Sequence, residues 1–341
     1  MIRCALRTTI ALGCRASGVL ASTERGIRDQ LIVLCYHRVL PAEHRRLYFN
    51  PDLVVTPEAF RSHCLLLKRR FDVRPLSEAV AAWHKRAART KPLAAITFDD
   101  GYRDNYEYAA PILAETGLAA TFFVIAGLVG TDQTTWYDRL ARAFAKCRAT
   151  RAIDTQIGEL TGLAFSSESS SAHSLVARAK RLAPEDRLRL IECVESAAGG
   201  PVKAADDCIM DWTQLAELDR AGNEIGSHTC MHEILTRLDD DRLRFELCES
   251  RRKLQERLGR PVRAFCYPNG DMDDRVARAT AEAGYDCAVI VDGGTNASGQ
   301  NPYRLKRWFV SEDRLADVWG AQSETLLRAE LCGLAKRIFR R

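Results

Sequence analysis

The chain has 341 residues, 46% of them hydrophobic and 28% charged, which are the proportions of a globular protein able to bury a sizeable core. Its formal net charge of +5 is small for this length and spread along the sequence, so composition alone does not indicate a nucleic-acid-binding protein. No stretch reaches the roughly eighteen apolar residues that a transmembrane helix requires.

Residues 1–30 precede the first predicted strand and form an N-terminal segment that can be helical. Arg3 and Arg7 resemble the basic start of a signal peptide, but Arg15 ends the apolar stretch after roughly seven residues, which is short for a signal-peptide core. Residues 11–14 (Ala-Leu-Gly-Cys) faintly resemble a lipoprotein cleavage site. We therefore expect the protein to remain in the cytoplasm, with membrane association or export as alternatives.

The twelve cysteines are scattered and include no Cys-x-x-Cys pair, so neither a zinc ribbon nor a thioredoxin-like motif is indicated. We interpret them as small apolar core residues of a protein in a reducing compartment.

From Leu31 onward, short apolar runs alternate with amphipathic segments, which is the pattern of parallel strands joined by helices. The predicted fold class is therefore α/β. Seven strands are predicted, at Leu31–Tyr36, Ala94–Phe98, Ala120–Ile125, Glu224–Ser227, Ala264–Tyr267, Cys287–Val291 and Leu305–Val310.

The helices between these strands have recognisable starts. Thr56-Pro57-Glu58 combines an N-cap, a proline at the first helical position and an acid in the first turn. Asp211 before Trp212 is a second cap of this kind. Residues 239–258 are predicted to form a long charged helix with one apolar face.

Two segments depart from this alternation. Residues 131–207 contain several arginine-rich helical patterns and no convincing strand, so we interpret them as a helical insertion between two strands. Residues 311–341 form a basic helical tail, which can rest on a membrane surface or, as is more common, pack on the domain. The apolar residues of this tail are Leu326, Leu327, Leu331, Leu334 and Ile338.

Two adjacent carboxylates, Asp99 and Asp100, end the second predicted strand. Because neighbouring buried carboxylates repel each other, the protein must supply a cation or a shared proton. One alternative is a tight turn in which Asp and Gly only satisfy backbone groups. Another is a phosphotransferase nucleophile, but that motif spaces its aspartates by one residue and these are adjacent.

Two histidines, His228 and His232, come four residues apart directly after the fourth predicted strand. This spacing puts both imidazoles on one face of a helical turn, within reach of one metal ion. Thr229 stands where the zinc-peptidase helix has glutamate, which argues against that motif. A capping histidine beside a surface histidine is the alternative for an isolated pair, but together with the two aspartates the pair indicates a metal site.

Residues 97–101 (Thr-Phe-Asp-Asp-Gly), followed by His228-Thr229-x-x-His232, resemble the pattern of the polysaccharide deacetylase family (NodB homology, carbohydrate esterase family four). The resemblance covers about residues 31–310 without the insertion. It implies a deformed barrel of about seven parallel strands. It also implies a divalent metal, usually zinc, held by Asp100, His228 and His232, with Asp99 as the general base.

The third motif of the family, R-x-P-Y-G, appears here in altered form as residues 266–270 (Cys-Tyr-Pro-Asn-Gly). Cys266 replaces the arginine that orients the base in the family. Asn269 replaces the tyrosine whose backbone N–H serves the oxyanion, and a backbone donor survives a change of side chain. Arg307, in the last predicted strand, can supply the missing guanidinium; the alternative is a solvent-facing arginine beside Lys306.

The late histidine that usually acts as general acid in the family is absent, because no histidine follows His232. Residues 36–39 (Tyr-His-Arg-Val) are similar to the opening motif of the poly-N-acetylglucosamine deacetylase branch, in which a histidine after the first strand takes this role. His37 is therefore the candidate acid, and a strand-end histidine that only satisfies its neighbours is the alternative.

The position of these residues supports the same grouping without any family. In a parallel α/β barrel, catalytic groups gather at the carboxyl ends of different strands. His37, Asp99, His228 and Asn269 each follow a different predicted strand. The sequence therefore predicts one site at that end of the barrel.

The resemblance implies hydrolysis of an N-acetyl group from an N-acetylated amino sugar, in a polysaccharide, an oligosaccharide or, inside the cell, a lipid- or nucleotide-linked precursor. Trp136 and Tyr137, which open the insertion, can stack on sugar rings or anchor the insertion, and we favour the anchor. The altered motif and the missing late histidine leave an alternative, a catalytically impaired homologue that binds glycan or scaffolds polysaccharide assembly. A third interpretation is a metal-dependent amidohydrolase for small non-sugar amides.

Overall fold

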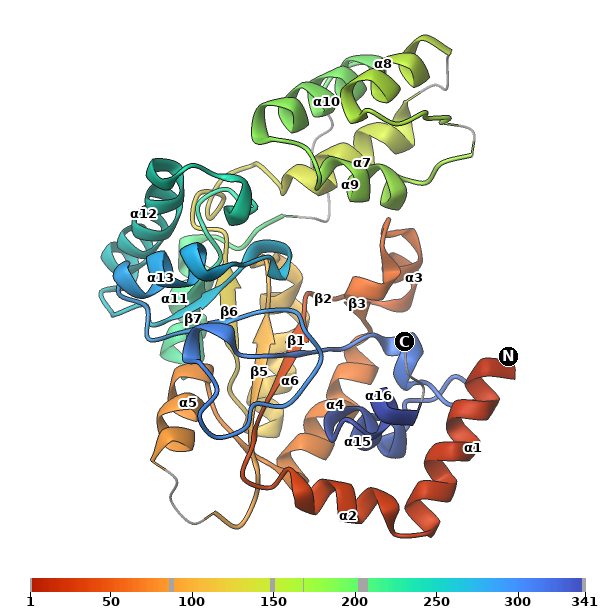
Figure 1. The fold of residues 1–341 in the computed structure, drawn as a ribbon, viewed down its shortest axis with the longest axis vertical. Coiled ribbons are helices and arrows are strands. Elements are labelled where there is room, and N and C mark those ends of the chain that lie inside the picture. Colours follow the sequence, from red (N-terminus) through yellow and green to blue (C-terminus); the bar gives the residue numbers. More distant parts are fainter. Residues whose placement is uncertain (1, 86–88, 148–150, 168, 202–207, 339–341) are drawn as a thin grey trace.

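The structure is a computed structural model and describes residues 2–85, 89–147, 151–167, 169–201 and 208–338 (Figure 1). Seven parallel strands form a sheet curled into a half-barrel, in the order β10-β1-β5-β6-β7-β8-β9. One parallel bridge, between Val289 and Leu305, joins the two ends of this sheet. The strands are β1 (Leu31–Tyr36), β5 (Leu93–Phe98), β6 (Thr121–Val124), β7 (Glu224–Ser227), β8 (Ala264–Cys266), β9 (Cys287–Val289) and β10 (Trp308–Phe309).

All seven predicted strands are therefore present and parallel, and the prediction of a deformed α/β barrel is confirmed. The sequence did not reveal three two-residue strands, because runs this short carry no detectable alternation. β4 (Asp72–Val73) pairs with β5, and β2 (Arg38–Val39) pairs with β3 (Val54–Val55) in a small separate sheet.

Side chains alternate between two apolar layers along the strands. On β1, Ile32 and Leu34 belong to the larger core, which includes buried side chains of the surrounding helices. Leu31 and Val33 belong to a smaller core with residues of β5, β8, β9 and the helix α5 (Leu76–His84). Cys35 is the next residue of β1 on the same face as Leu31 and Val33, and Thr97 is its partner on β5. The inner face thus becomes more polar toward the carboxyl ends of the strands.

The predicted helix starts are confirmed. Thr56 caps its helix by accepting a hydrogen bond from the Ala59 N–H at 3.3 Å, and Asp211 forms a capping box with Gln214. These helices pack around the sheet (Figure 1) together with others of the same layer. The helices of this layer are α4 (Pro57–Arg70), α6 (Ala110–Thr116), α11 (Trp212–Arg220), α12 (Asp240–Leu258) and α13 (Asp274–Glu282). The connecting segments contain the short helices α3 (Ala42–Leu47) and α14 (Glu312–Leu315), a π-helical turn at Asn105–Ala109, and 3-10 turns at Pro51–Leu53, Leu235–Arg237, Pro268–Gly270 and Pro302–Arg304.

The predicted insertion, residues 131–207, forms four helices and, within its described residues, no strand. They lie beyond the carboxyl ends of the barrel strands, at the top of Figure 1. This group is called the insertion below, and it consists of α7 (Trp136–Lys146), α8 (Arg151–Thr161), α9 (Ala172–Ala179) and α10 (Pro184–Ala197).

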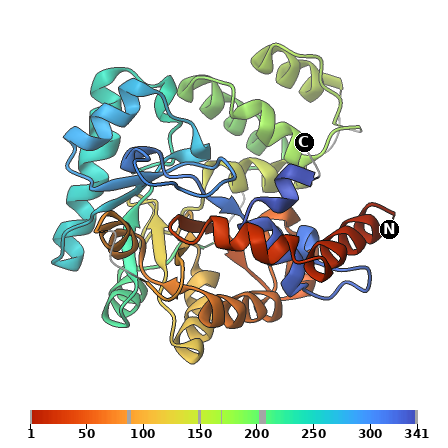
Figure 2. The same cartoon turned by 60° about the horizontal axis from the view of Figure 1, so that its bottom comes forward.

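The N-terminal and C-terminal helices lie side by side (Figures 1 and 2), where α1 (Ile2–Ala16) and α2 (Val19–Gly26) contact α15 (Glu324–Leu331), which α16 (Leu334–Ile338) follows. Arg328 pairs with Glu24 across this contact at 2.8 Å. The predicted apolar face of the tail is buried at Leu326, Leu327, Leu331 and Leu334, and only Ile338 is partly exposed. The four leucines therefore pack on the domain, as in the more common of the two predicted alternatives.

No helix in the described part of the chain is both long and apolar enough to cross a bilayer. The cysteines are not uniformly core residues, because Cys248 is exposed and Cys14, Cys147, Cys193 and Cys208 are half-buried. The buried cysteines are Cys35, Cys64, Cys230, Cys266, Cys287 and Cys332.

Candidate active site

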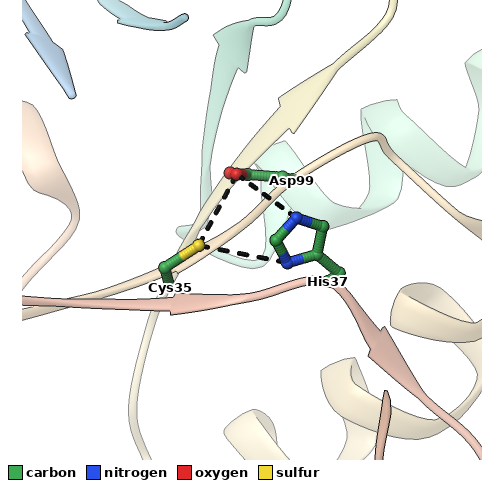
Figure 3. Close-up of side chains that lie close together, drawn as sticks. All are labelled: Cys35, His37 and Asp99. Atoms are coloured by element: carbon green, nitrogen blue, oxygen red, sulfur yellow. Dashed lines mark hydrogen bonds and ion pairs between the residues drawn. The ribbon is translucent and has the colours of Figure 1, made fainter. Parts of the chain in front are cut away.

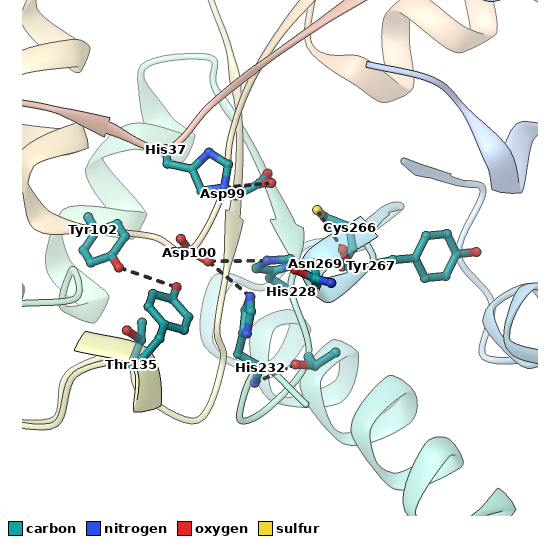
Figure 4. A network of polar contacts seen from close by, with 12 residues as sticks. His37, Asp99, Asp100, Tyr102, Thr135, His228, His232, Cys266, Tyr267 and Asn269 are labelled. Carbon is teal, nitrogen blue, oxygen red and sulfur yellow. Dashed lines mark hydrogen bonds and ion pairs between the residues drawn. The ribbon is translucent and has the colours of Figure 1, made fainter. Parts of the chain in front are cut away.

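The carboxyl ends of the strands bring the predicted site residues together, as Figure 4 shows for His37, Asp99, Asp100, His228 and Asn269. His37 follows β1, the two aspartates follow β5, His228 follows β7, and Asn269 follows β8. His232 follows in the same loop, which is not helical, so the predicted helical turn is wrong although both imidazoles still reach Asp100. Arg307 joins them from the position before β10. All seven residues predicted from the sequence therefore line one site.

The backbone of this site is strained. Among the described residues, the only non-glycine residues with positive φ are Asp100 (73°), Thr229 (67°), His232 (57°) and Asn269 (61°). Such conformations cost about 1–3 kcal/mol each and persist only where surrounding contacts hold them. One of these contacts is the hydrogen bond from the His232 N–H to Thr229 Oγ1, at 2.8 Å. The concentration of strain at this one place is typical of a functional site.

Asp99 is bound by a two-pronged ion pair. The Arg307 Nη1 and Nη2 groups donate to Asp99 Oδ1 and Oδ2 at 2.6 and 2.7 Å, and both side chains are buried. Burial by itself raises the pKa of Asp99, but the charge and hydrogen bonds of Arg307 outweigh it and hold the pKa well below its usual value. The alternative of a solvent-facing Arg307 is wrong, because its side chain is completely enclosed.

The altered third motif fits this arrangement. Arg307 Nη2 also lies 3.2 Å from Cys266 Sγ, and Nη1 donates to Thr97 Oγ1 at 3.1 Å. Cys266 thus occupies the motif position of the missing arginine with a small side chain. The space it leaves is filled by a guanidinium that comes from the other end of the sheet.

Asp100, His228 and His232 converge as a buried cluster of metal-ligating atoms. Asp100 Oδ1 lies 3.5 Å from Nε2 of both histidines. His228 Nδ1 lies 2.7 Å from the Cys266 carbonyl oxygen, which can only accept, so Nδ1 is protonated and Nε2 is the nitrogen that faces Asp100.

The charges of this cluster also suit a cation. Burial lowers the pKa of His232 to about 3, so its ring is neutral at pH 7. Burial raises the pKa of Asp100, but the neighbouring imidazoles outweigh it and bring the value to about 2. An ionised carboxylate therefore lies beside the neutral ring of His232 and the Nε2 atom of His228, a set of donor atoms that fits a divalent metal.

His37 sits between Asp99 and a thiol (Figure 3). Its Nε2 is 3.9 Å from Asp99 Oδ2, and its Nδ1 is 4.0 Å from Cys35 Sγ. Burial lowers the pKa of His37, although Asp99 and Asp100 oppose this. Cys35, His37 and Asp99 are close enough to be a second metal cluster. We reject that interpretation, because both Asp99 oxygens already bind Arg307.

Lys180, which lies in no recognisable sequence motif, reaches the site from the insertion. Its Nζ donates to Asn269 Oδ1 at 2.7 Å, and Asn269 Nδ2 donates to Asp271 Oδ2 at 2.8 Å. Burial lowers the pKa of Lys180, against the opposing effect of Asp100 and Asp271. No local signal marked this residue, since it is one of many basic residues in a helical segment.

The start of the insertion is anchored beside the cluster of Asp100, His228 and His232. The Tyr137 ring packs edge-on against His232, with centroids 5.2 Å apart, and is almost fully buried. The next residue, Asp138, accepts hydrogen bonds from Tyr102 at 2.7 Å and from Tyr48 at 3.0 Å. Trp136 packs under the Arg187 guanidinium at 4.8 Å. These contacts agree with the anchoring role predicted for Trp136 and Tyr137.

Comparisons with known proteins found similar chains by sequence and by fold. The Bacillus subtilis (strain 168) protein YxkH, whose name places it among polysaccharide deacetylases, is 22% identical over 231 residues. The alignment covers 68% of this chain but only 56% of YxkH.

Solved structures share the fold. The Streptococcus pyogenes deacetylase PplD, solved with acetate, has a TM-score of 0.59 at 19% identity, covering 89% of this chain and 98% of that one. IcaB from Ammonifex degensii has a TM-score of 0.55 at 20% identity, covering 84% and 93%.

The family itself is identified from the sequence. The family model for polysaccharide deacetylases matches residues 86–288, from before the two aspartates to the last residues of β9. The matched region is more than half of the chain and includes Asp99, Asp100, His228, His232 and Asn269. The chain belongs to the polysaccharide deacetylase family.

Proposed function

We propose that this protein is a metal-dependent hydrolase that removes the N-acetyl group from an N-acetylated amino sugar, in a polysaccharide, an oligosaccharide or a glycan precursor. The observation that carries the proposal is the placement of two adjacent aspartates on different partners. Asp99 faces Arg307, whereas Asp100 faces His228 and His232. One carboxylate is thus free of the metal cluster and available for proton transfer.

Asp100, His228 and His232 would hold the metal, and a site of one oxygen and two nitrogen donors with open positions is typical of catalytic zinc. When bound, the metal would polarise the acyl carbonyl and make a water molecule more acidic. His228 is already oriented for this, because the Cys266 carbonyl fixes its tautomer.

Asp99 would accept the proton of the attacking water. Arg307 keeps its carboxylate ionised and fixes its orientation, although the same charge makes Asp99 a weaker base. The backbone N–H of Asn269 would donate to the oxyanion of the tetrahedral intermediate.

His37 would donate a proton to the departing amine, which is a poor leaving group unless protonated. Burial lowers the pKa of His37 and so favours its neutral form, which must gain a proton before it can donate one. Asp99, 3.9 Å away, is the neighbour that acquires one during attack. The pair would therefore pass the proton of the water to the product amine.

The competing function is a catalytically impaired homologue that binds or scaffolds glycan. Two departures from the family motifs suggested it, the cysteine at position 266 and the absent late histidine. The cysteine at position 266 is weak support for this function, because Arg307 supplies a guanidinium to Asp99 instead. A small-amide hydrolase would share these residues, and only a comparison of substrates separates it.

The test compares Asp99→Asn with Asp100→Asn. We expect Asp99→Asn to retain metal and lose about 10²–10⁴-fold in the rate of acetate release from N-acetylglucosamine oligomers. We expect Asp100→Asn to lose metal, because it removes a ligand. Metal content and acetate release are measured with and without chelator, and Asp132→Asn, an exposed carboxylate, serves as control. The opposite distribution of metal loss would refute the assignment, and bound metal without turnover of any acylated sugar would favour the binding protein.

A further inference from the structure

Asn269 is held by both ends of its side chain. The Oδ1 atom accepts from Lys180, and the Nδ2 group donates to Asp271. Lys180 lies 89 positions earlier in the sequence, directly after α9 of the insertion. The amide therefore bridges a cation of the insertion and an anion of the barrel loop.

This bridge acts on a backbone that needs support. Asn269 has φ 61° and ψ 0°, in the left-handed region that asparagine tolerates better than most residues. Rotation about its N–Cα bond would swing the side chain away from Lys180 and Asp271. Fixing the side chain thus fixes the direction of the peptide N–H relative to the strand end that carries it.

The backbone that carries Lys180 is held in place, because the insertion forms other ion pairs with the barrel. Arg187 of α10 pairs with Glu233, the residue after His232. Arg242 of α12 pairs with Glu185 at 2.6 Å. Loss of the Lys180 contact would therefore free Asn269 without releasing the insertion.

We infer that Lys180 is a positioning residue, which holds the backbone N–H of Asn269 in the direction that the oxyanion requires, so that the insertion completes the active site. This inference rests on the proposed function. The inference explains how asparagine can stand where the family motif has tyrosine. The Asn269 amide accepts a hydrogen bond from Lys180 of the insertion and donates one to Asp271.

Two other roles would use the same lysine differently. If Lys180 only anchored the insertion, breaking another link between insertion and barrel would have a similar effect. If its ammonium contacted the substrate directly, its loss would matter whether or not Asn269 had a side chain. Both alternatives make predictions that differ from ours.

The experiment measures kcat and KM for acetate release in Lys180→Met, Asn269→Gly and the double variant. Glycine keeps the positive φ of position 269 but removes the bridged amide. We expect each single variant to lose about tenfold in kcat with little change in KM, less than the loss of an entire oxyanion donor. We expect the double variant to lose no more than either single one, because both remove the same contact. Lys180→Arg, which can still donate to Oδ1, should retain most of the activity.

Three results would overturn the inference. A wild-type kcat in Lys180→Met would show that the contact between Lys180 and Asn269 does not contribute to catalysis. An approximately hundredfold loss in the double variant, or an effect mainly on KM, would indicate direct contact with substrate. An equal loss in Glu185→Gln, which breaks the pair with Arg242, would indicate simple anchoring. Lys146→Met, an exposed lysine of α7, controls for the change of charge.

A second readout does not depend on turnover. The Gly270 N–H donates to the Tyr267 carbonyl at 2.9 Å, so hydrogen exchange of residues 267–271 reports on this turn. We expect these residues to exchange faster in Lys180→Met and Asn269→Gly than in the wild-type protein. In Lys146→Met we expect the wild-type exchange rate. Unchanged exchange would refute the bridge even if the proposed function held. Absence of turnover in the wild-type protein would refute the proposed function and leave the exchange result to decide about Lys180.

Discussion

Asp99 keeps its charge in a buried site because Arg307 satisfies both of its oxygens. Arg307 is satisfied in turn, since its five N–H groups find Asp99 twice, Thr97, Cys266 and the Ile290 carbonyl. A buried ion pair is tolerated only when the remaining donors and acceptors are paired in this way. The pair is therefore a single unit, in which loss of either member leaves a buried charge without compensation.

We predict that Arg307→Met destabilises the protein by about 3–5 kcal/mol, the usual result of removing one partner from a buried ion pair. Arg307→Lys should lose less stability, because lysine keeps the positive charge and loses only the paired hydrogen bonds of the guanidinium. Chemical denaturation measures both. Arg252→Met, which removes an exposed arginine paired with Glu249 and Glu256, is the control and should change stability by less than about 1 kcal/mol.

The same substitution should alter the pH dependence of activity. Arg307 holds the pKa of Asp99 below its usual value, so the carboxylate remains unprotonated down to low pH in the natural protein. Without Arg307, burial dominates and the pKa of Asp99 rises, so activity should be lost at a higher pH as the solution is acidified. The pH profile of kcat/KM measures this. An acid limb that stays in place would show that another group controls it.

At the scale of elements, a two-residue turn sends the adjacent aspartates to different partners. Asp100 and Gly101 both have positive φ, 73° and 79°. The turn lies directly against β6, where a Cβ at position 101 would come within 2.9 Å of Val124 Cγ1 and 3.2 Å of its Cα. Glycine is therefore required here for two separate reasons, the backbone conformation and the lack of space.

We predict that Gly101→Ala destabilises the protein more than Gly117→Ala, and that it also weakens metal binding. Gly117, which ends α6, has φ 65°, but only the flexible Lys68 side chain lies near its missing Cβ. Gly117→Ala should therefore cost about 1–2 kcal/mol from the backbone alone. Gly101→Ala adds a clash with a strand, which should displace Asp100. Denaturation and metal content measure the two effects, and equal losses of stability would argue against the clash.

At the scale of the whole molecule, the first and last helices pack against each other and against the barrel helix α4. α15 packs against α1, α2 and α4, and its leucines face inward. The pair of Arg328 with Glu24 joins the same elements. The first and last helices therefore behave as part of the folded domain rather than as appendages.

We predict that Leu331→Ala destabilises the protein by about 2–5 kcal/mol, as expected for truncating a buried leucine. Ile338→Ala, at the partly exposed end of the same helical region, should change stability by less than about 1 kcal/mol. Urea denaturation of both variants makes the comparison. Wild-type stability in Leu331→Ala would mean that the tail is not packed on the domain in solution.

The sequence by itself determined the parts that depend on local pattern. Seven apolar runs predicted seven strands, and caps such as Thr56 and Asp211 marked helix starts, because both signals lie within a few neighbouring residues. The motifs around Asp99 and His228 predicted a site at the strand ends, because parallel strands of one barrel place their carboxyl ends together. The strands β2, β3 and β4 escaped detection for the same reason, since each has only two residues and lies outside any predicted apolar run.

Only the tertiary structure decided which distant side chains complete this site. Arg307 binds Asp99 across 208 positions of sequence, and Lys180 binds Asn269 across 89. From the sequence, Arg307 fitted an inward and an outward orientation equally well, and Lys180 was one basic residue among many. Their roles follow from burial and charge: a buried carboxylate requires a cation, and the closure of the barrel and the docking of the insertion determine which cation is within reach.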